Sequence, residues 1–247
     1  VGVFVDAKNI NDTLTRVRWD AYWQKTQKQM NNHVHQVSET PGSTKRNGKT
    51  YVFDASEVTM DSTADNRLMT VGTSLQADWQ ISENHYLITG YEFSRDKLKA
   101  DTVSDVTTFM ENARLDRGQV QIPMGDMTLH PVTARYNEGQ QSVHSIFASM
   151  ESQLPADFVA NYGMRYTYVK SEMTAANAET QMSMNGMFMG ASSDNSAGST
   201  GKTHDDRIVF NAGVTWTGIE DLALRATWAQ GFRAPLLQEK YITNTMG

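Results

Sequence analysis

The chain has 247 residues, a formal net charge of −6 and no cysteine. The acidic balance opposes a nucleic-acid-binding surface, which would need a basic patch. The lack of cysteine excludes disulfides, thiolate metal sites and cysteine nucleophiles, and no apolar run approaches the roughly 20 residues of a membrane-spanning helix.

Alternation of apolar and polar residues is the dominant pattern of the chain. In chain order, it predicts strands at 1–7, 13–24, 69–81, 85–93, 142–152, 158–169, 207–216 and 222–228. Successive side chains of a strand point to opposite faces, so 69–81 has a polar face and an apolar face, the latter formed by Met69, Val71, Thr73, Leu75, Ala77, Trp79 and Ile81. Several of these segments exceed the roughly 5–6 residues of a typical globular strand. The pattern in 142–152 is weaker, because Phe147 lies on its polar face.

The connections between these strands alternate strictly between short and long. The short ones are 8–12, 82–84, 154–157 and 218–221, and the long ones are 25–66, 97–141 and 172–206. A transmembrane β-barrel has short periplasmic turns and long extracellular loops, whereas structureless loops of this length oppose a compact soluble domain. The sequence therefore predicts an all-β fold, an antiparallel transmembrane β-barrel with about eight strands.

Aromatic residues support this prediction, because they lie near both ends of the expected strands. Trp79 and Trp216 are next to short turns, and the residues near the long connections are Trp23, Tyr91, Phe93, Tyr166, Tyr168 and Trp228. Two aromatic girdles around an apolar band fit the two membrane–water interfaces. A soluble barrel or sandwich is the alternative, and it would bury the apolar face in a closed core, as represented by Trp19, Leu75, Tyr162 and Phe210.

The last expected strand runs into a polar segment that contains a proline. Continuing the alternation from Trp228 places Phe232 on the lipid side and Arg233 on the lumen side. Pro235 cannot donate to a strand ladder, so we expect the strand to end there, at the edge of the membrane.

This segment resembles a stretch of TonB-dependent outer-membrane receptors. The matching residues are Gly231, Phe232, Arg233, Ala234 and Pro235, followed by Leu237, Gln238, Glu239 and Tyr241. Haem and haemoglobin receptors of the family have this Phe-Arg-Ala-Pro string, called the FRAP box, and siderophore receptors have it too, so it indicates the family more than the substrate. Lys240 departs from the usual Leu-Gln-Glu-Leu-Tyr pattern.

The resemblance implies a larger protein with a TonB-binding segment, an N-terminal plug and a 22-stranded barrel. We therefore expect residues 1–247 to be about a third of such a barrel, without the plug. The implied function is TonB-dependent uptake of an iron complex across a Gram-negative outer membrane, with haem or haemoglobin first and a ferric siderophore second. The implied partners are the TonB complex, through the missing plug, the iron complex and membrane lipid. No intrinsic cofactor is expected.

Two alternatives to iron uptake stay open. One is a copper-uptake receptor of the same family. The other is a small closed barrel that acts as an anchor or adhesin, because eight strands can close alone. An enzyme is not expected, because the sequence has no Gly-rich phosphate loop, Gly-x-Ser-x-Gly or His-Glu-x-x-His motif.

Histidines and methionines of the long connections are the candidate ligand residues. His33 and His35 share one side of an extended segment and could present two imidazoles to haem iron or a divalent metal, with His130 and His204 as weaker candidates. Thioethers are soft ligands that suit Cu(I), and the third long connection contains Met182, Met184, Met187 and Met189. Solvated histidines and an adaptable apolar methionine surface are the simpler interpretations.

Arginines on the lumen side form the last candidate set. They are Arg16, Arg18, Arg165, Arg225 and Arg233. Such a set could hold an anionic ligand or, as is more common in the family, pair with acidic groups of a plug. Asp20, Asp78 and Glu92 lie on the same side and could pair within the wall.

Overall fold

The computed structural model describes residues 1–46, 48–194, 201–233 and 235 of the chain. These residues form one antiparallel sheet without any helix, which confirms the all-β prediction. Its strands are β1 (Gly2–Lys8), β2 (Leu14–Ser38), β3 (Gly42–Arg46), β4 (Lys49–Phe53), β5 (Ala55–Ser82), β6 (His85–Asp116), β7 (Gln121–Leu154), β8 (Phe158–Met184), β9 (Met187–Asp194), β10 (Lys202–Ile219) and β11 (Leu222–Ala229). No helix among these residues is long and apolar enough to cross a membrane.

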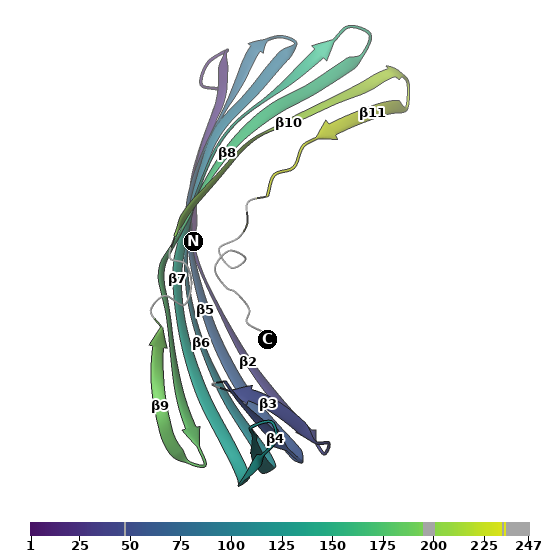
Figure 1. Cartoon of the computed structure of the whole chain (residues 1–247). Coiled ribbons are helices and arrows are strands. Elements are labelled where there is room, and N and C mark those ends of the chain that lie inside the picture. Colours follow the sequence, from purple (N-terminus) through teal and green to yellow (C-terminus); the bar gives the residue numbers. More distant parts are fainter. Residues whose placement is uncertain (47, 195–200, 234, 236–247) are drawn as a thin grey trace.

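Eight strands form the main path of the sheet, in the order β1-β2-β5-β6-β7-β8-β10-β11. Each of these eight strands pairs with the next one in this order, and the eight correspond to the eight expected strands. Within the described residues β1 pairs only with β2 and β11 only with β10, so the bowed sheet is open (Figure 1). The described residues therefore do not form the small closed barrel that was the structural alternative.

The four short turns lie where the alternation predicted them. They join β1 to β2, β5 to β6, β7 to β8 and β10 to β11. Ala156 and Asp157 of the third turn have positive φ angles of 62° and 61°, and Asp221 of the fourth has 63°. Turns this tight require such left-handed positions, which Asp and Asn tolerate better than most residues.

The prediction of three long loops is wrong, because most of those residues continue the strands. β2, β5, β6, β7 and β8 are 25, 28, 32, 34 and 27 residues long, whereas about 9–11 residues suffice to cross a membrane. One transverse row of the sheet contains Lys25, Met69, Lys97, Gln140 and Glu172. We call the parts of these five strands on the side of this row away from the short turns, together with β3, β4 and β9, the extension. Both faces of the extension can meet water, so its sequence lacks the apolar–polar alternation, while ladder hydrogen bonds still satisfy its backbone.

The extension has a small core of its own. Phe53 of β4 packs with buried residues of β6 and β7, namely Met110, Ala113, Met127 and Leu129. Met110 and Met127 are 0% and 2% exposed. β4 also pairs with β6 from Thr50↔Asp116 to Val52↔Arg114, so the β3–β4 hairpin covers one face of the tip of the sheet (Figure 1).

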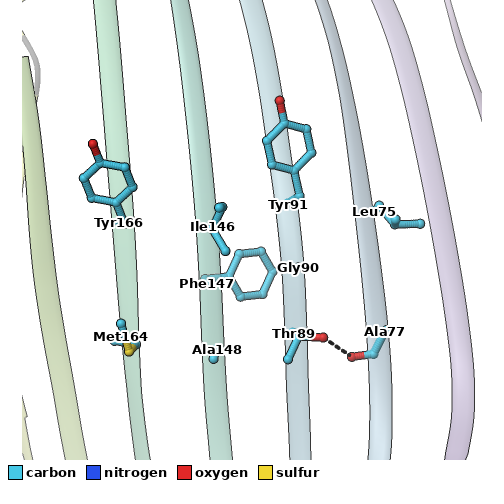
Figure 2. Close-up of a pocket in the computed structure, with 10 residues that line it drawn as sticks. All are labelled: Leu75, Ala77, Thr89, Gly90, Tyr91, Ile146, Phe147, Ala148, Met164 and Tyr166. Atoms are coloured by element: carbon cyan, nitrogen blue, oxygen red, sulfur yellow. Dashed lines mark hydrogen bonds between the residues drawn. The ribbon is translucent and has the colours of Figure 1, made fainter. Parts of the chain in front are cut away.

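The convex face of the sheet is apolar along the membrane band. Trp19, Leu75, Tyr162 and Phe210 are 41%, 47%, 49% and 47% exposed. They are therefore not packed in a closed core, as a soluble barrel would require. Figure 2 shows a shallow apolar depression on this face, where the small residues Ala77, Thr89 and Ala148 lie among Leu75, Tyr91, Ile146, Met164 and Tyr166.

Candidate functional site

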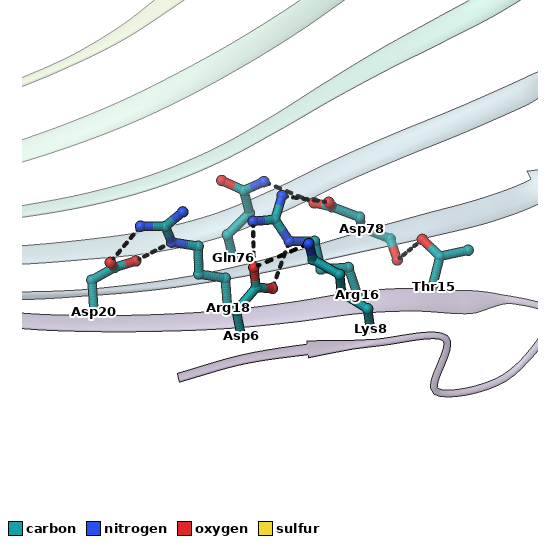
Figure 3. A network of polar contacts seen from close by, with 8 residues as sticks. All are labelled: Asp6, Lys8, Thr15, Arg16, Arg18, Asp20, Gln76 and Asp78. Atoms are coloured by element: carbon teal, nitrogen blue, oxygen red, sulfur yellow. Dashed lines mark hydrogen bonds and ion pairs between the residues drawn. The ribbon is translucent and has the colours of Figure 1, made fainter. Parts of the chain in front are cut away.

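Charged side chains of β1, β2 and β5 gather on the concave face (Figure 3). Cross-strand partners in a sheet point to the same face, and the register pairs Lys8 with Arg16, Asp6 with Arg18, and Arg16 with Asp78. Alternate polar positions of three strands thus meet at one place. We call this set the lumen charge network, and it consists of Asp6, Lys8, Thr15, Arg16, Arg18, Asp20, Gln76 and Asp78.

Arg16 is the centre of the lumen charge network. Its Nε and Nη2 donate to the two carboxylate oxygens of Asp6 at 2.7 and 2.9 Å, a two-pronged pairing that fits the guanidinium. Its Nη1 lies 3.9 Å from Oδ2 of Asp78. The Asp78 residue is only 3% exposed, and Gln76 donates to its other carboxylate oxygen at 2.8 Å. Arg16 therefore balances one partly and one almost fully buried carboxylate.

Two further arginines of the concave face also have carboxylate partners in the wall. Arg18 donates to both oxygens of Asp20 at 2.8 and 2.9 Å. Arg165 donates to Glu92, and its guanidinium carbon lies 5.8 Å from the centre of the Phe147 ring. Three of the five candidate arginines are thus paired within the sheet. Arg225 of β11 forms no salt bridge with any other described residue.

Phe147, which breaks the polar pattern of β7, covers a glycine. It is the cross-strand partner of Gly90, and a Cβ atom on Gly90 would lie 2.3 Å from Cζ of its ring. The ring lies beside Gly90 in Figure 2. Tyr22 covers Gly72 in the same way, with a hypothetical Cβ 2.4 Å from its Cζ. The sequence did not reveal either pair, because only the cross-strand register shows which glycine lies opposite which aromatic residue.

His33 and His35 lie in the extension, on the same face of β2 as Trp19 and Trp23. The β2–β5 register has no bulge between Arg16 and Ser38, so odd positions keep one face. Nδ1 of His33 is 2.7 Å from Oδ1 of Asp61, and Nδ1 of His35 is 3.3 Å from the Thr59 hydroxyl. Among the described residues no three His, Cys, Asp or Glu side chains are grouped as a metal site. The ligand role of the two histidines stays a prediction.

Only one of the two weaker histidine candidates lies in the extension with this pair. Nε2 of His130 is 2.6 Å from Oδ1 of Asp105, and the His204 ring stacks on Tyr168 with 6.4 Å between ring centres. His130 is three strands from His33 and His35, and its partner Asp105 is the cross-strand neighbour of Asp61, the partner of His33. His204 lies in a row nearer the membrane band.

The four candidate methionines lie on both sides of a tight turn. Met182 and Met184 belong to β8, and Met187 and Met189 to β9. Asn185 and Gly186 join the strands with φ angles of 48° and 77°, the pair of positive angles typical of a two-residue hairpin. Met184 packs against the core of the extension, whereas Met187 and Met189 are exposed.

The family motif lies after the last strand. β11 ends at Ala229, so the expectation that the strand continues to Phe232 and Pro235 is wrong, and Phe232 does not join an aromatic girdle from a strand. The backbone N–H of Gln230 still donates to the Phe210 carbonyl of β10 at 2.9 Å, and residues 231–233 then leave the sheet on its concave side (Figure 1). Buried Gln141 donates from Nε2 to the Pro235 carbonyl at 3.0 Å, so the chain turns inward instead of extending the ladder.

Other motif positions have less structural detail. Gly231 and Arg233 lie outside any strand and are exposed. Ala234, Gln238, Glu239 and Tyr241 are outside the described residues.

Comparison with known families supports the barrel architecture. Residues 5–247 match the family model described as TonB dependent receptor-like, beta-barrel. The chain belongs to the TonB-dependent receptor family. Proteins with this barrel are outer-membrane transport proteins, which places the receptor chain in the outer membrane and its concave face towards the lumen. No curated protein matches the chain.

Proposed function

We propose that this receptor chain forms part of a barrel that imports an iron complex, with haem or haemoglobin as the first candidate and a ferric siderophore as the second. The observation that carries the proposal is the Phe-Arg-Ala-Pro string at 232–235 in a chain of the TonB-dependent receptor family. TonB would act through a plug domain, and residues 1–247 would be a partial barrel around that plug. We expect transport without catalysis.

The pairing of the concave arginines assigns them a supporting role in this proposal. Arg16, Arg18 and Arg165 each donate to a carboxylate of the wall, so they offer little uncompensated charge to an anionic cargo. Capture of the iron complex is better suited to the extension, where Nδ1 of His33 faces the Asp61 carboxylate and Nδ1 of His35 faces the Thr59 hydroxyl across the ladder.

The decisive experiment measures equilibrium binding of haem and of ferric siderophores to the full-length receptor, together with growth of a receptor-deletion strain on each as sole iron source. In the double variant H33A/H35A we expect weaker haem binding. The matched control is H85A/H144A, which removes one histidine near a periplasmic turn and one on β7 within the membrane band. Unchanged haem affinity in H33A/H35A would refute the histidine assignment, and absence of both haem and siderophore uptake would refute the iron proposal.

Copper uptake is the second candidate, because Met187 and Met189 are exposed on β9 of the extension. Thioethers in such a position suit Cu(I). Competition with a Cu(I) chelator would measure its affinity for the full-length receptor and for M187L/M189L. Loss of affinity in this variant would favour copper, whereas an unchanged value would leave iron as the cargo.

A further inference from the structure

On the convex face, the type of side chain changes from one transverse row to the next between the membrane band and the extension. One transverse row joins Trp19, Leu75, Tyr91, Ile146, Tyr166 and Ile208 across six strands. The next row contains Phe93, His144 and Tyr168, whose rings pack side by side with centres 4.9 and 6.4 Å apart, and ends at Asp206. Aromatic rows of this kind lie at the membrane–water interface, so the next rows are at the level of the lipid headgroups.

Those next two rows are basic. The first joins Trp23, Val71, Arg95, Ser142, Lys170 and His204, and the second joins Lys25, Met69, Lys97, Gln140, Glu172 and Lys202. We call Lys25, Arg95, Lys97, Lys170 and Lys202 the basic band. No bulge interrupts the registers at these rows, so all five side chains share the face of Trp19 and Leu75. The band stands out in a chain whose net charge is −6.

Most of the charge of the basic band is uncompensated. Glu172 is the only carboxylate in the two rows, and it pairs with Lys202 at 3.2 Å. Lys25, Lys97 and Lys170 form no salt bridge with any other described residue. Arg95 donates to the neutral Gln140 side chain. All four of these side chains are exposed.

We infer that the basic band binds the phosphate groups of a phosphorylated glycolipid headgroup in the outer leaflet of the membrane. Lys97 and Lys170 are two strands apart, roughly 10 Å along the row direction, so long flexible side chains can reach one headgroup from both sides. The acyl chains of the same lipid would lie on the apolar rows below. The carboxylate-free Arg95–Lys170 row lies next to the aromatic row, where a headgroup phosphate would be. This inference depends on the outer-membrane location and not on which cargo is transported.

The experiment is lipid binding by the full-length receptor, delipidated in detergent and followed by native mass spectrometry. The probes are bisphosphorylated lipid A, the same lipid after removal of both phosphates, and inorganic phosphate. We expect preference for the bisphosphorylated lipid and roughly 30-fold weaker binding in K97Q/K170Q, since each surface cation contributes about a factor of five to binding an anionic lipid. The control K28Q/K45Q removes two exposed lysines outside the band, and it should bind as the wild type does.

A charge-preserving variant keeps the result interpretable. K97R/K170R should retain binding, and heat-modifiable migration in gels would verify that each variant is folded. Equal binding of phosphorylated and dephosphorylated lipid, or equal losses in K97Q/K170Q and K28Q/K45Q, would overturn the inference. Competition by millimolar inorganic phosphate as effective as that by lipid A would also overturn it, because the site would then recognise a free anion. Cargo uptake, measured separately, distinguishes these outcomes from failure of the proposed function.

Discussion

Replacing Gly90 by alanine tests the cross-strand pairing of a glycine with an aromatic ring. The new Cβ would lie 2.3 and 2.5 Å from Cζ and Cε1 of Phe147, and 3.0 Å from its Cε2. These distances are far inside van der Waals contact, so the ring must move off Gly90 and away from Arg165. Overpacking of this kind costs typically 1–3 kcal/mol, and loss of the cation–π contact adds about 0.5 kcal/mol. We therefore expect Gly90→Ala to lower the free energy of unfolding by about 2 kcal/mol.

The background of Phe147→Ala should reverse this effect. Removing the ring removes the three atoms nearest to the new methyl group, and alanine restricts the unfolded chain more than glycine does, so Gly90→Ala should then be neutral or stabilising by up to about 1 kcal/mol. The assay is urea unfolding of the full-length receptor in detergent micelles, with all four members of the double-mutant cycle. Gly2→Ala is the control, since its Cβ would meet only an ordinary contact at 3.5 Å. Equal costs of Gly90→Ala in both backgrounds would refute the reasoning.

Three further predictions concern the charge pairs and the core of the extension. Arg16→Met should destabilise the barrel, because it removes the counter-charge of the almost fully buried Asp78 and leaves Asp6 with only Lys8 at 3.8 Å. Arg225→Met should cost much less in the same urea assay, because Arg225 forms no salt bridge with any other described residue. Met110→Ala should cost about 2–5 kcal/mol locally and release the β3–β4 hairpin, seen as faster amide exchange at 42–53, whereas the exposed Met189→Ala should leave that exchange unchanged. The hydrogen bond from Arg67 holds the pKa of Asp65 below its usual value of 3.8, so this pair stabilises the extension above that pH and the stabilisation is lost as the pH falls through the lowered pKa. The rates of amide exchange near Asp65 should accordingly differ between wild type and Asp65→Asn at pH 6, and the two rates should converge under strong acid. A difference in rate that stays constant with pH would contradict a stabilising role of this ion pair.

The membrane band was predictable from sequence because each face meets a different solvent. Residues such as Leu75 and Gln76 alternate there, and the eight strands and four short turns follow from that alternation. In the extension this contrast is absent, so segments such as 101–109 read as polar loop although they are paired along their whole length. Asn185-Gly186 was a readable hairpin signal for the turn between β8 and β9.

The candidate site was less predictable, because partners depend on register. The sequence placed Arg16 and Asp78 on one face, but only the β2–β5 ladder sets them opposite each other. After the end of β11 the Pro235 carbonyl accepts a hydrogen bond from Gln141, which is 94 residues away in sequence, and no local pattern contains that information.

The length of the β5–β6 ladder has a consequence for how the chain finds its alignment. A shift of one residue would turn every side chain to the other face, and in the polar stretch between Met69 and Ala55 such a slip would meet little resistance from the side chains themselves. The apolar rows fix the alignment at the lower end, and Met110, seated against Met127 beneath Phe53, fixes it at the upper end. Because the register is fixed at both ends of the ladder, the polar stretch between them cannot shift by itself.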